Sequence, residues 1–149
     1  MKIRKASTEE LKELAKLYKE AFPVHNIFQR TEKEVFNYLE TLSGEILVAV
    51  EGKKILGGLA LVYELSTPEH KRARLKHIAV AKDAQRKGIG SKLLKEAEKL
   101  VEKGKIEIHA SENEKEALEF YKKNGYEVEG ELKSHYRPNE TCYILGKVI

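Results

Sequence analysis

The chain of 149 residues is long enough for one hydrophobic core and too short for two ordinary domains, so we expect a single domain over residues 1–149. Its 28 Lys and Arg and its 24 Asp and Glu nearly balance to a net charge of +4, which is typical of a solvated surface, so nucleic acid is not an expected partner. The single cysteine excludes an intramolecular disulfide, and together with five scattered histidines it predicts no metal site.

The sequence carries no signal of a membrane protein. No stretch approaches the ~20 apolar residues that span a bilayer. The charged start at Met1, Lys2 and Arg4 leads into an amphipathic helix and not into the apolar core of a signal peptide. We therefore expect a cytoplasmic protein without a membrane partner. For the oligomeric state, a monomer and a homodimer both remain open.

Apolar spacing and turn residues predict a succession of short elements. Ser7 and Thr8 stand just before Glu9 and Glu10, which is typical of a capped helix start. In chain order we expect a strand at 2–5, a helix from 8 that Pro23 ends, a helix from near 31 that Gly44 breaks, strands at 46–50, 55–63 and 74–80, a helix from 89 that closes at Gly104, a strand at 106–110, a helix at 113–123, and strands at 126–132 and 142–149.

This order, βααβββαβαββ, predicts an α/β fold with a mixed central sheet. Such an order suits a sheet that is partly antiparallel and partly parallel, with helices on both faces. Residues 52–54 separate two strand patterns and predict a hairpin. Gly57 and Gly58 lie inside a strand pattern, where glycine marks a bulge or a close approach of neighbouring groups.

The segment Gln85, Arg86, Lys87, Gly88, Ile89, Gly90 separates the strand at 74–80 from the long amphipathic helix that follows. Glycines let backbone N–H groups surround an anion, the start of a helix supplies unpaired donors, and the two basic residues add charge. This layout predicts a cradle for a phosphate-bearing cofactor. An ordinary turn is the alternative, because a Gly-x-Gly pair is a weak motif. A dinucleotide fingerprint and a P-loop are both excluded, since the third glycine and the Gly-Lys-Ser/Thr ending are absent.

Three motifs together make the chain similar to the GNAT acetyltransferases over essentially its whole length. They are the strand 76–80, the Gln-x-x-Gly-x-Gly of residues 85–90, and the tail Ala117, Phe120, Tyr121, Gly125, Tyr126. The resemblance implies acetyl-coenzyme A as cosubstrate, with its diphosphate on the glycine loop, its pantetheine along the preceding strand and a tyrosine near its sulfur. The cofactor residues that it implies here are Ile78, Ala79, Val80, Gln85, Arg86, Lys87, Gly88, Ile89, Gly90, Ser91 and Tyr121.

Tyr121 and Asn113 each have two interpretations. Tyr121 sits on a helix that stops at Gly125, a geometry that can aim its hydroxyl at the loop, whereas without the loop a core aromatic would be the commoner case. The family's asparagine lies seven residues before the tyrosine, where this chain has Glu114. Asn113 is one place earlier, and it either contacts coenzyme or caps the helix.

Acetyl transfer to an amine needs a base to take a proton and an acid for the leaving thiolate. Tyr121 is the candidate acid, and the resemblance implies a backbone N–H of residues 78–80 for the thioester oxygen. Glu107 and His109 are candidate bases, since they share one face of a strand; a merely solvated face is the alternative. His77 is a reserve, because alternation points it to the face opposite Arg74 and Lys76 unless a bulge intervenes, and a packed or surface histidine is the ordinary case.

The C-terminal segment His135 to Pro138, with 140–143 after it, resembles the tyrosine-rich hairpin of ribosomal-protein-alanine-type acetyltransferases. That branch implies a protein N-terminal α-amine as acceptor, with Tyr136 on one side and Phe22, Pro23, Val24 and His25 on the other. The match is incomplete, since His135 replaces a tyrosine and Thr141 an acid, and hairpin packing is the alternative role of these aromatics. A small amine or polyamine as acceptor, and a noncatalytic coenzyme-binding module, are the rival functions.

Overall fold

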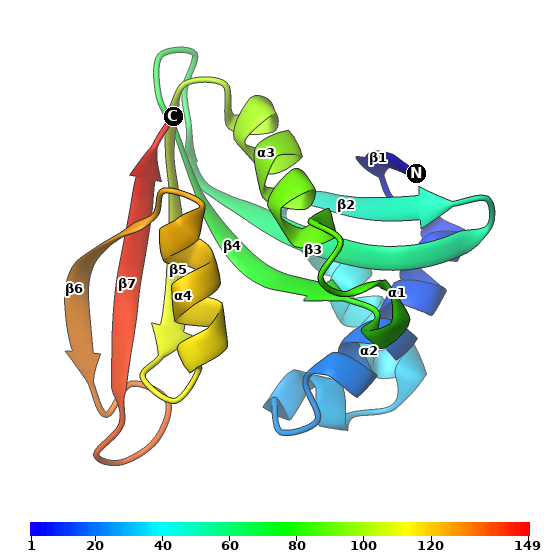
Figure 1. The fold of residues 1–149 in the computed structure, drawn as a ribbon, viewed down its shortest axis with the longest axis horizontal. Coiled ribbons are helices and arrows are strands. Elements are labelled where there is room, and N and C mark those ends of the chain that lie inside the picture. The colour runs from blue at the N-terminus through cyan, green and yellow to red at the C-terminus, as the bar shows by residue number, and fades with distance from the viewer. The chain divides into compact units, whose positions relative to one another are not determined.

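Seven strands in one mixed sheet and four α-helices form the chain in a computed structural model that describes residues 1–149 (Figure 1). The strand order is β1-β2-β3-β4-β5-β7-β6. The α/β class and the order βααβββαβαββ are confirmed, with two short 3-10 turns added. The elements are β1 (Lys2–Lys5), α1 (Thr8–Ala21), η1 (Asn26–Gln29), α2 (Glu32–Thr41), β2 (Gly44–Glu51), β3 (Lys54–Ser66), β4 (Lys71–Val80), η2 (Lys82–Ala84), α3 (Ile89–Val101), β5 (Gly104–Ser111), α4 (Lys115–Lys123), β6 (Glu127–Lys133) and β7 (Thr141–Val148).

The residues cluster into two compact units. The first holds residues 1–62 and 77–97, and the second holds residues 63–76 and 98–149. The strands β3 and β4 and the helix α3 contribute to both units. None of the helices combines the length and the apolar character that a transmembrane span needs.

The first unit begins with the capped helix that the sequence predicts. Ser7 Oγ accepts a hydrogen bond from the Glu10 N–H at 3.3 Å, and the Glu10 carboxylate accepts one from the Ser7 N–H at 2.9 Å. These two bonds satisfy donors that the first turn of a helix otherwise leaves unpaired. The apolar face of α1 then buries Leu11, Leu14 and Tyr18 against α2 and β2. The strands β1, β2 and β3 pair in antiparallel register beside this helix layer.

Gly57 and Gly58 place helices on opposite faces of β3. A Cβ on Gly58 would lie 2.4 Å from Leu14 of α1, whereas a Cβ on Gly57 would lie 2.8 Å from the Ala79 carbonyl oxygen of β4 and 3.4 Å from Leu93 of α3. Neighbouring strand residues point to opposite faces, so α1 and α3 cover the two faces of β3 in this unit. Both predictions for this pair are confirmed, because the β2–β3 register also shifts by one residue beside Gly57.

The second unit is built on β5, β7 and β6, which run side by side (Figure 1). The pairs β5–β7 and β7–β6 are antiparallel, while β5 pairs in parallel with the first half of β4, from Lys71 opposite Gly104 to Leu75 opposite Ile108. This parallel pairing extends β4 three residues before the predicted start at position 74. The helix α4 starts at Lys115 and not at the expected Asn113.

We expect Gly58→Ala to lower the free energy of unfolding by about 1–3 kcal/mol, because the added methyl group overlaps the fully buried Leu14. Gly130→Ala is the matched control. Its Cβ would meet only Ile144 at 3.9 Å, so we expect a change within about 0.5 kcal/mol. Urea denaturation of both variants measures the difference, and equal stabilities would contradict the close contact between α1 and β3.

Candidate functional site

The turn before α3 presents a row of unpaired backbone donors. The first helical hydrogen bond runs from Lys92 N–H to the Gly88 carbonyl at 3.1 Å, and the N–H groups of residues 86–91 have no backbone acceptor. Gly88 has φ of 76° and Arg86 has φ of 63°, so the chain turns tightly just before the helix. A Cβ on Gly88 would meet nothing within 4 Å, which leaves space beside these donors. Unpaired N–H groups at a helix start bind anions.

The side chains of this turn have two roles: one anchors the turn to β4, and two add positive charge. Gln85 Nε2 donates to the Val80 carbonyl at 3.0 Å and so ties the turn to the end of β4. Arg86 and Lys87 are exposed. Gly90 and Ser91 lie in the first turn of α3, in agreement with the expected helix start at 89. The turn therefore combines the positive charge of Arg86 and Lys87 with the backbone donors of residues 86–91.

Beside this turn lies a hollow of about 340 Å³, whose lining includes Lys54, Asp83, Lys87 and Lys92. Lys54 is ion-paired with Asp83. Glu51 also lines the hollow, so its three lysines and two acids leave a small positive balance on this side of the turn.

The second half of β4 has a free backbone edge. The pairing with β5 ends at Leu75, so on that edge the backbone of residues 76–80 has no strand neighbour. Unpaired strand groups are ready partners for an extended ligand. Ile78 and Val80 are half-buried and Ala79 is buried. A chain with amide groups, such as pantetheine, has the donors and acceptors that suit this edge.

His77 belongs to an aromatic cluster in the first unit. It is 5% exposed, its Nε2 lies 2.7 Å from the Tyr38 hydroxyl, and its ring lies edge-on to Phe28 at 4.8 Å between centroids. The packed interpretation of His77 is thus confirmed. Phe22 and His25 contact the same rings. Of the other residues expected at the acceptor, Pro23 is exposed and Val24 is 68% exposed.

In the second unit, Tyr121 lies on the buried face of α4. It is 7% exposed, and its ring contacts Phe120 and Tyr126. Burial raises the pKa of Tyr121 well above its usual range, and the Glu114 carboxylate adds to the effect. The phenol therefore carries its proton at neutral pH, which a proton donor requires.

A pocket of about 140 Å³ in the second unit contains His109, one of the three candidate bases. Its lining includes Arg74, Lys76, His109 and Tyr136. Burial, followed by the positive charge of Arg74, lowers the pKa of His109, so the imidazole is neutral at neutral pH. Glu107 lies on the same face of β5, but it is ion-paired with Lys105 at 3.7 Å.

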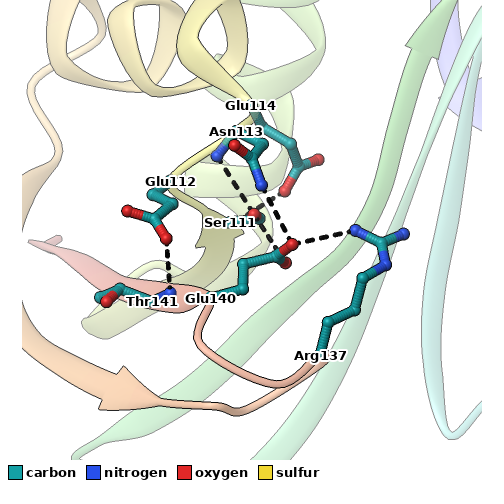
Figure 2. Close-up of polar contacts among 7 residues, drawn as sticks. All are labelled: Ser111, Glu112, Asn113, Glu114, Arg137, Glu140 and Thr141. Carbon is teal, nitrogen blue, oxygen red and sulfur yellow. Dashed lines mark hydrogen bonds and ion pairs between the residues drawn. The ribbon is translucent and has the colours of Figure 1, made fainter.

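The buried Glu140 joins two loops of the second unit. Figure 2 shows its carboxylate between Ser111, Asn113 and Arg137: Ser111 Oγ donates at 2.8 Å, Asn113 Nδ2 at 3.0 Å and Arg137 Nη1 at 3.1 Å. The Ser111 hydrogen bond, assisted by Arg137, lowers the pKa of Glu140. Of the two alternatives for Asn113, the structure excludes the helix cap, because its amide donates to this carboxylate and Glu114 holds the cap position.

The sequence interpretation missed the loop residues around this carboxylate. Glu140, Arg137 and Ser111 were not candidates, and His135 was noted only as a departure from a tyrosine. Ser111 and Glu140 are separated by 29 positions, and no spacing rule connects them. A buried acid is recognisable only from its three-dimensional surroundings.

Comparison with known families gives one match. The sequence profile described as the acetyltransferase (GNAT) domain matches residues 43–128, more than half of the chain and including the whole turn before α3. No curated protein matches the sequence.

Several solved structures share the fold at low sequence identity. NAA60 of Arabidopsis thaliana, in complex with acetyl-CoA, is 17% identical with a TM-score of 0.82, covering 99% of each chain. Naa50 of the same plant, with the bisubstrate analogue CoA-Ac-MVNAL, is 22% identical with a TM-score of 0.76, covering 99% of this chain and 98% of that one. The aminoglycoside 6'-N-acetyltransferase of Enterococcus faecium is 18% identical with a TM-score of 0.78, covering 99% and 97%. These likenesses confirm the fold and leave the acceptor undecided.

Proposed function

We propose that this chain, which belongs to the GNAT acetyltransferase family and is therefore an acetyl-CoA-dependent N-acetyltransferase, acetylates the N-terminal α-amine of a protein. The acetyl group passes directly from the thioester to the amine in a ternary complex. The observation that carries this choice is the charge of the pocket at His109, where Arg74 and Lys76 are two of the lining residues. Aminoglycosides and polyamines carry several ammonium groups, and this charge repels them more than it repels a single α-amine.

The amine chemistry agrees with this choice. A free α-amino group has a pKa of about 8, whereas a lysine side chain has one of about 10.4, so the α-amine loses its proton more readily near neutral pH. The half-exposed Tyr136 beside His109 offers an aromatic surface for the first side chain of a peptide. The fold likeness to the aminoglycoside enzyme keeps a small amine as the second candidate.

A panel of acceptors tests the proposal. We expect peptides with a free N-terminus to be acetylated, with kcat/KM at least about tenfold above that for a polyamine or an aminoglycoside, given the repulsion of multiply charged amines. The matched control is the same peptide with a blocked N-terminus and one internal lysine. Robust turnover of the polyamine or the aminoglycoside without turnover of the free peptides would reject the proposed acceptor.

For the cosubstrate, we assign the diphosphate of acetyl-CoA to the backbone N–H groups of residues 86–91 and to Arg86 and Lys87. Support comes from the unpaired donors, the open space at Gly88 and the adjacent positive charge. We assign the pantetheine to the free edge of β4 at residues 78–80. A backbone N–H of that segment then stabilises the thioester oxygen as negative charge develops on it.

We expect Gly88→Val to weaken coenzyme A binding about tenfold or more, because a branched side chain would fill the space beside the donors. A tenfold loss corresponds to one or two lost charge-assisted hydrogen bonds. Gly52→Val is the matched control, since Gly52 also has positive φ and an open surrounding but lies in the β2–β3 hairpin. Both variants incur backbone strain, but only the Gly88 variant changes the proposed diphosphate site. A comparison of their coenzyme A affinities by calorimetric titration therefore separates strain from binding. Equal affinities in the two variants would contradict the assignment.

For Tyr121 we propose the role of general acid, which gives the leaving coenzyme thiolate a proton as the tetrahedral intermediate collapses. The buried and protonated hydroxyl supports this role. The S–C bond breaks with its electron pair on sulfur, and the phenolic proton neutralises the resulting thiolate.

Tyr121→Phe should lower kcat by about 100-fold while the dissociation constant of coenzyme A changes little, because the ring and its packing remain. Steady-state kinetics and a binding titration on the same preparation measure the two effects. Tyr126→Phe is the control, since Tyr126 is also buried but donates to Glu98. An unchanged kcat in Tyr121→Phe would remove the acid role.

Among the three candidate bases we propose His109. Its imidazole lines the pocket and is neutral, whereas Glu107 is paired with Lys105 and His77 is packed among aromatic rings. A neutral imidazole can accept the proton that the amine releases, directly or through one water molecule.

His109→Ala should lower kcat by about 100-fold, the scale of one lost general base, without raising the KM for acetyl-CoA comparably. Glu107→Gln provides the comparison, because it keeps the shape of the neighbouring residue and removes only its charge. We expect the smaller loss in Glu107→Gln. The reverse order in steady-state rates would move the base role to Glu107.

A further inference from the structure

Three side chains with metal-binding atoms meet in the second unit. The ring nitrogens of His109 and His135 and the Sγ of Cys142 all lie within 4.8 Å of one another. In the sequence they are 26 and 7 positions apart, in no spacing typical of a metal motif. Two imidazoles and one thiol are the donors that zinc-class ions prefer in proteins.

The sheet fixes two of the three donors. His109 of β5 is opposite Ile144 of β7, and Ser111 is opposite Cys142. Residues directly opposite each other, and residues two apart on one strand, share a face, so His109 and Cys142 are diagonal neighbours on the same face. Cys142 is 1% exposed and is the most deeply buried of the three donors. The half-buried His109 lies nearer to solvent.

The third donor comes from the loop between β6 and β7. The His135 ring lies 5.8 Å from the His109 ring and 4.7 Å from the Tyr136 ring, between centroids. The Glu140 network holds this loop: the Ser134 N–H donates to the Glu140 carbonyl at 3.0 Å, and the Glu140 carboxylate is itself held by Ser111 and Asn113 (Figure 2). The backbone next to His135 is therefore fixed before any ligand binds.

The distances are close to those of a bound ion. Zinc bonds of about 2.0–2.1 Å to nitrogen and 2.3 Å to sulfur place tetrahedral donors roughly 3.3–3.7 Å apart. The donors here need to approach by only about 1 Å, which small rotations of the exposed His135 and the half-buried His109 side chains can supply. Arg74 and Lys76 line the same pocket, and their positive charge opposes a cation there. Zinc differs from an ammonium group because it forms coordinate bonds and converts the Cys142 thiol to a thiolate, whose negative charge offsets part of this repulsion. Glu64 also pairs with the Arg74 guanidinium at 3.2 Å.

We propose that His109, His135 and Cys142 bind one Zn²⁺ ion, with water in the fourth position. The thiol of Cys142 loses its proton to solvent when its sulfur bonds to the metal, and both histidines bind as neutral imidazoles through ring nitrogens. An open fourth position distinguishes this site from closed structural zinc sites, which have four protein ligands.

Metal binding also has a consequence for catalysis, and this consequence alone rests on the proposed role of His109. An imidazole nitrogen bonded to zinc has no lone pair left for a proton. Zinc should therefore inhibit acetyl transfer at concentrations that fill the site. The natural role of the site is then a reversible block of the base.

The experiment uses the untagged full chain and the metal alone. We expect one Zn²⁺ per chain in equilibrium dialysis, and a Co²⁺ adduct with the thiolate-to-cobalt absorption and the visible bands of tetrahedral cobalt. His135→Ala and Cys142→Ala should each weaken Zn²⁺ binding by about 10- to 100-fold or more. His70→Ala is the matched control, because His70 is exposed between β3 and β4 and lies outside the cluster.

Absence of Zn²⁺ binding, or native affinity in both His135→Ala and Cys142→Ala, would overturn the site. The exposed His135 makes its variant a fair test even where loss of the buried Cys142 side chain perturbs folding. Stoichiometric binding without inhibition would keep the metal site and reject the base role of His109. The two proposals therefore fail separately.

Discussion

The turn before α3 has more hydrogen-bond donors than the chain supplies acceptors for. The N–H groups of residues 86–91 precede the first helical hydrogen bond, which Lys92 donates, and no backbone carbonyl accepts from them. Backbone donors without a partner in the chain bond to water or bind an anion. The rest of the first unit supports this segment: Gln85 ties it to β4, and the contact of Gly57 with Ala79 and Leu93 sets β3 close to the strand and the helix that flank it.

The second unit depends on a different interaction, the buried carboxylate of Glu140. An acid that is 7% exposed is stable only with hydrogen-bonding partners, and here Ser111, Asn113 and Arg137 supply them. The same contacts join the loop after β5 to the loop after β6. The pocket at His109 therefore has a fixed wall, although Tyr136 and His135 lie on an exposed turn. Glu114 stands where the family resemblance implies an asparagine, and its carboxylate accepts from the Ser111 N–H at 2.7 Å.

Particular residues show how far sequence reasoning reached. The capped start of α1 was predicted from Ser7 and the glutamates after it, and its capping box is present. For α2 the sequence predicted a start near 31, and the structure adds a second capping box between Thr31 and Glu34. Strand alternation predicted that His77 lies on the face opposite Arg74 and Lys76, and the structure decided that this face is packed at His77. Of the two alternatives for Asn113, the helix cap is excluded because its amide donates to a carboxylate 27 positions away. The 3-10 turns at Asn26–Gln29 and Lys82–Ala84 carry no strong signal of their own, since a single turn gains little from local propensity.

The sequence by itself determined the element order, the sheet class, the glycine turn and the likeness to an acetyl-CoA-dependent family, because each of these depends on spacing within a few residues. Only the tertiary structure decided which polar side chains meet. The end of the β4–β5 pairing at Leu75, the Glu140 network and the cluster of His109, His135 and Cys142 depend on strand register and on loop contacts between distant positions. Register is set by the packing of the whole sheet, and local sequence does not encode it.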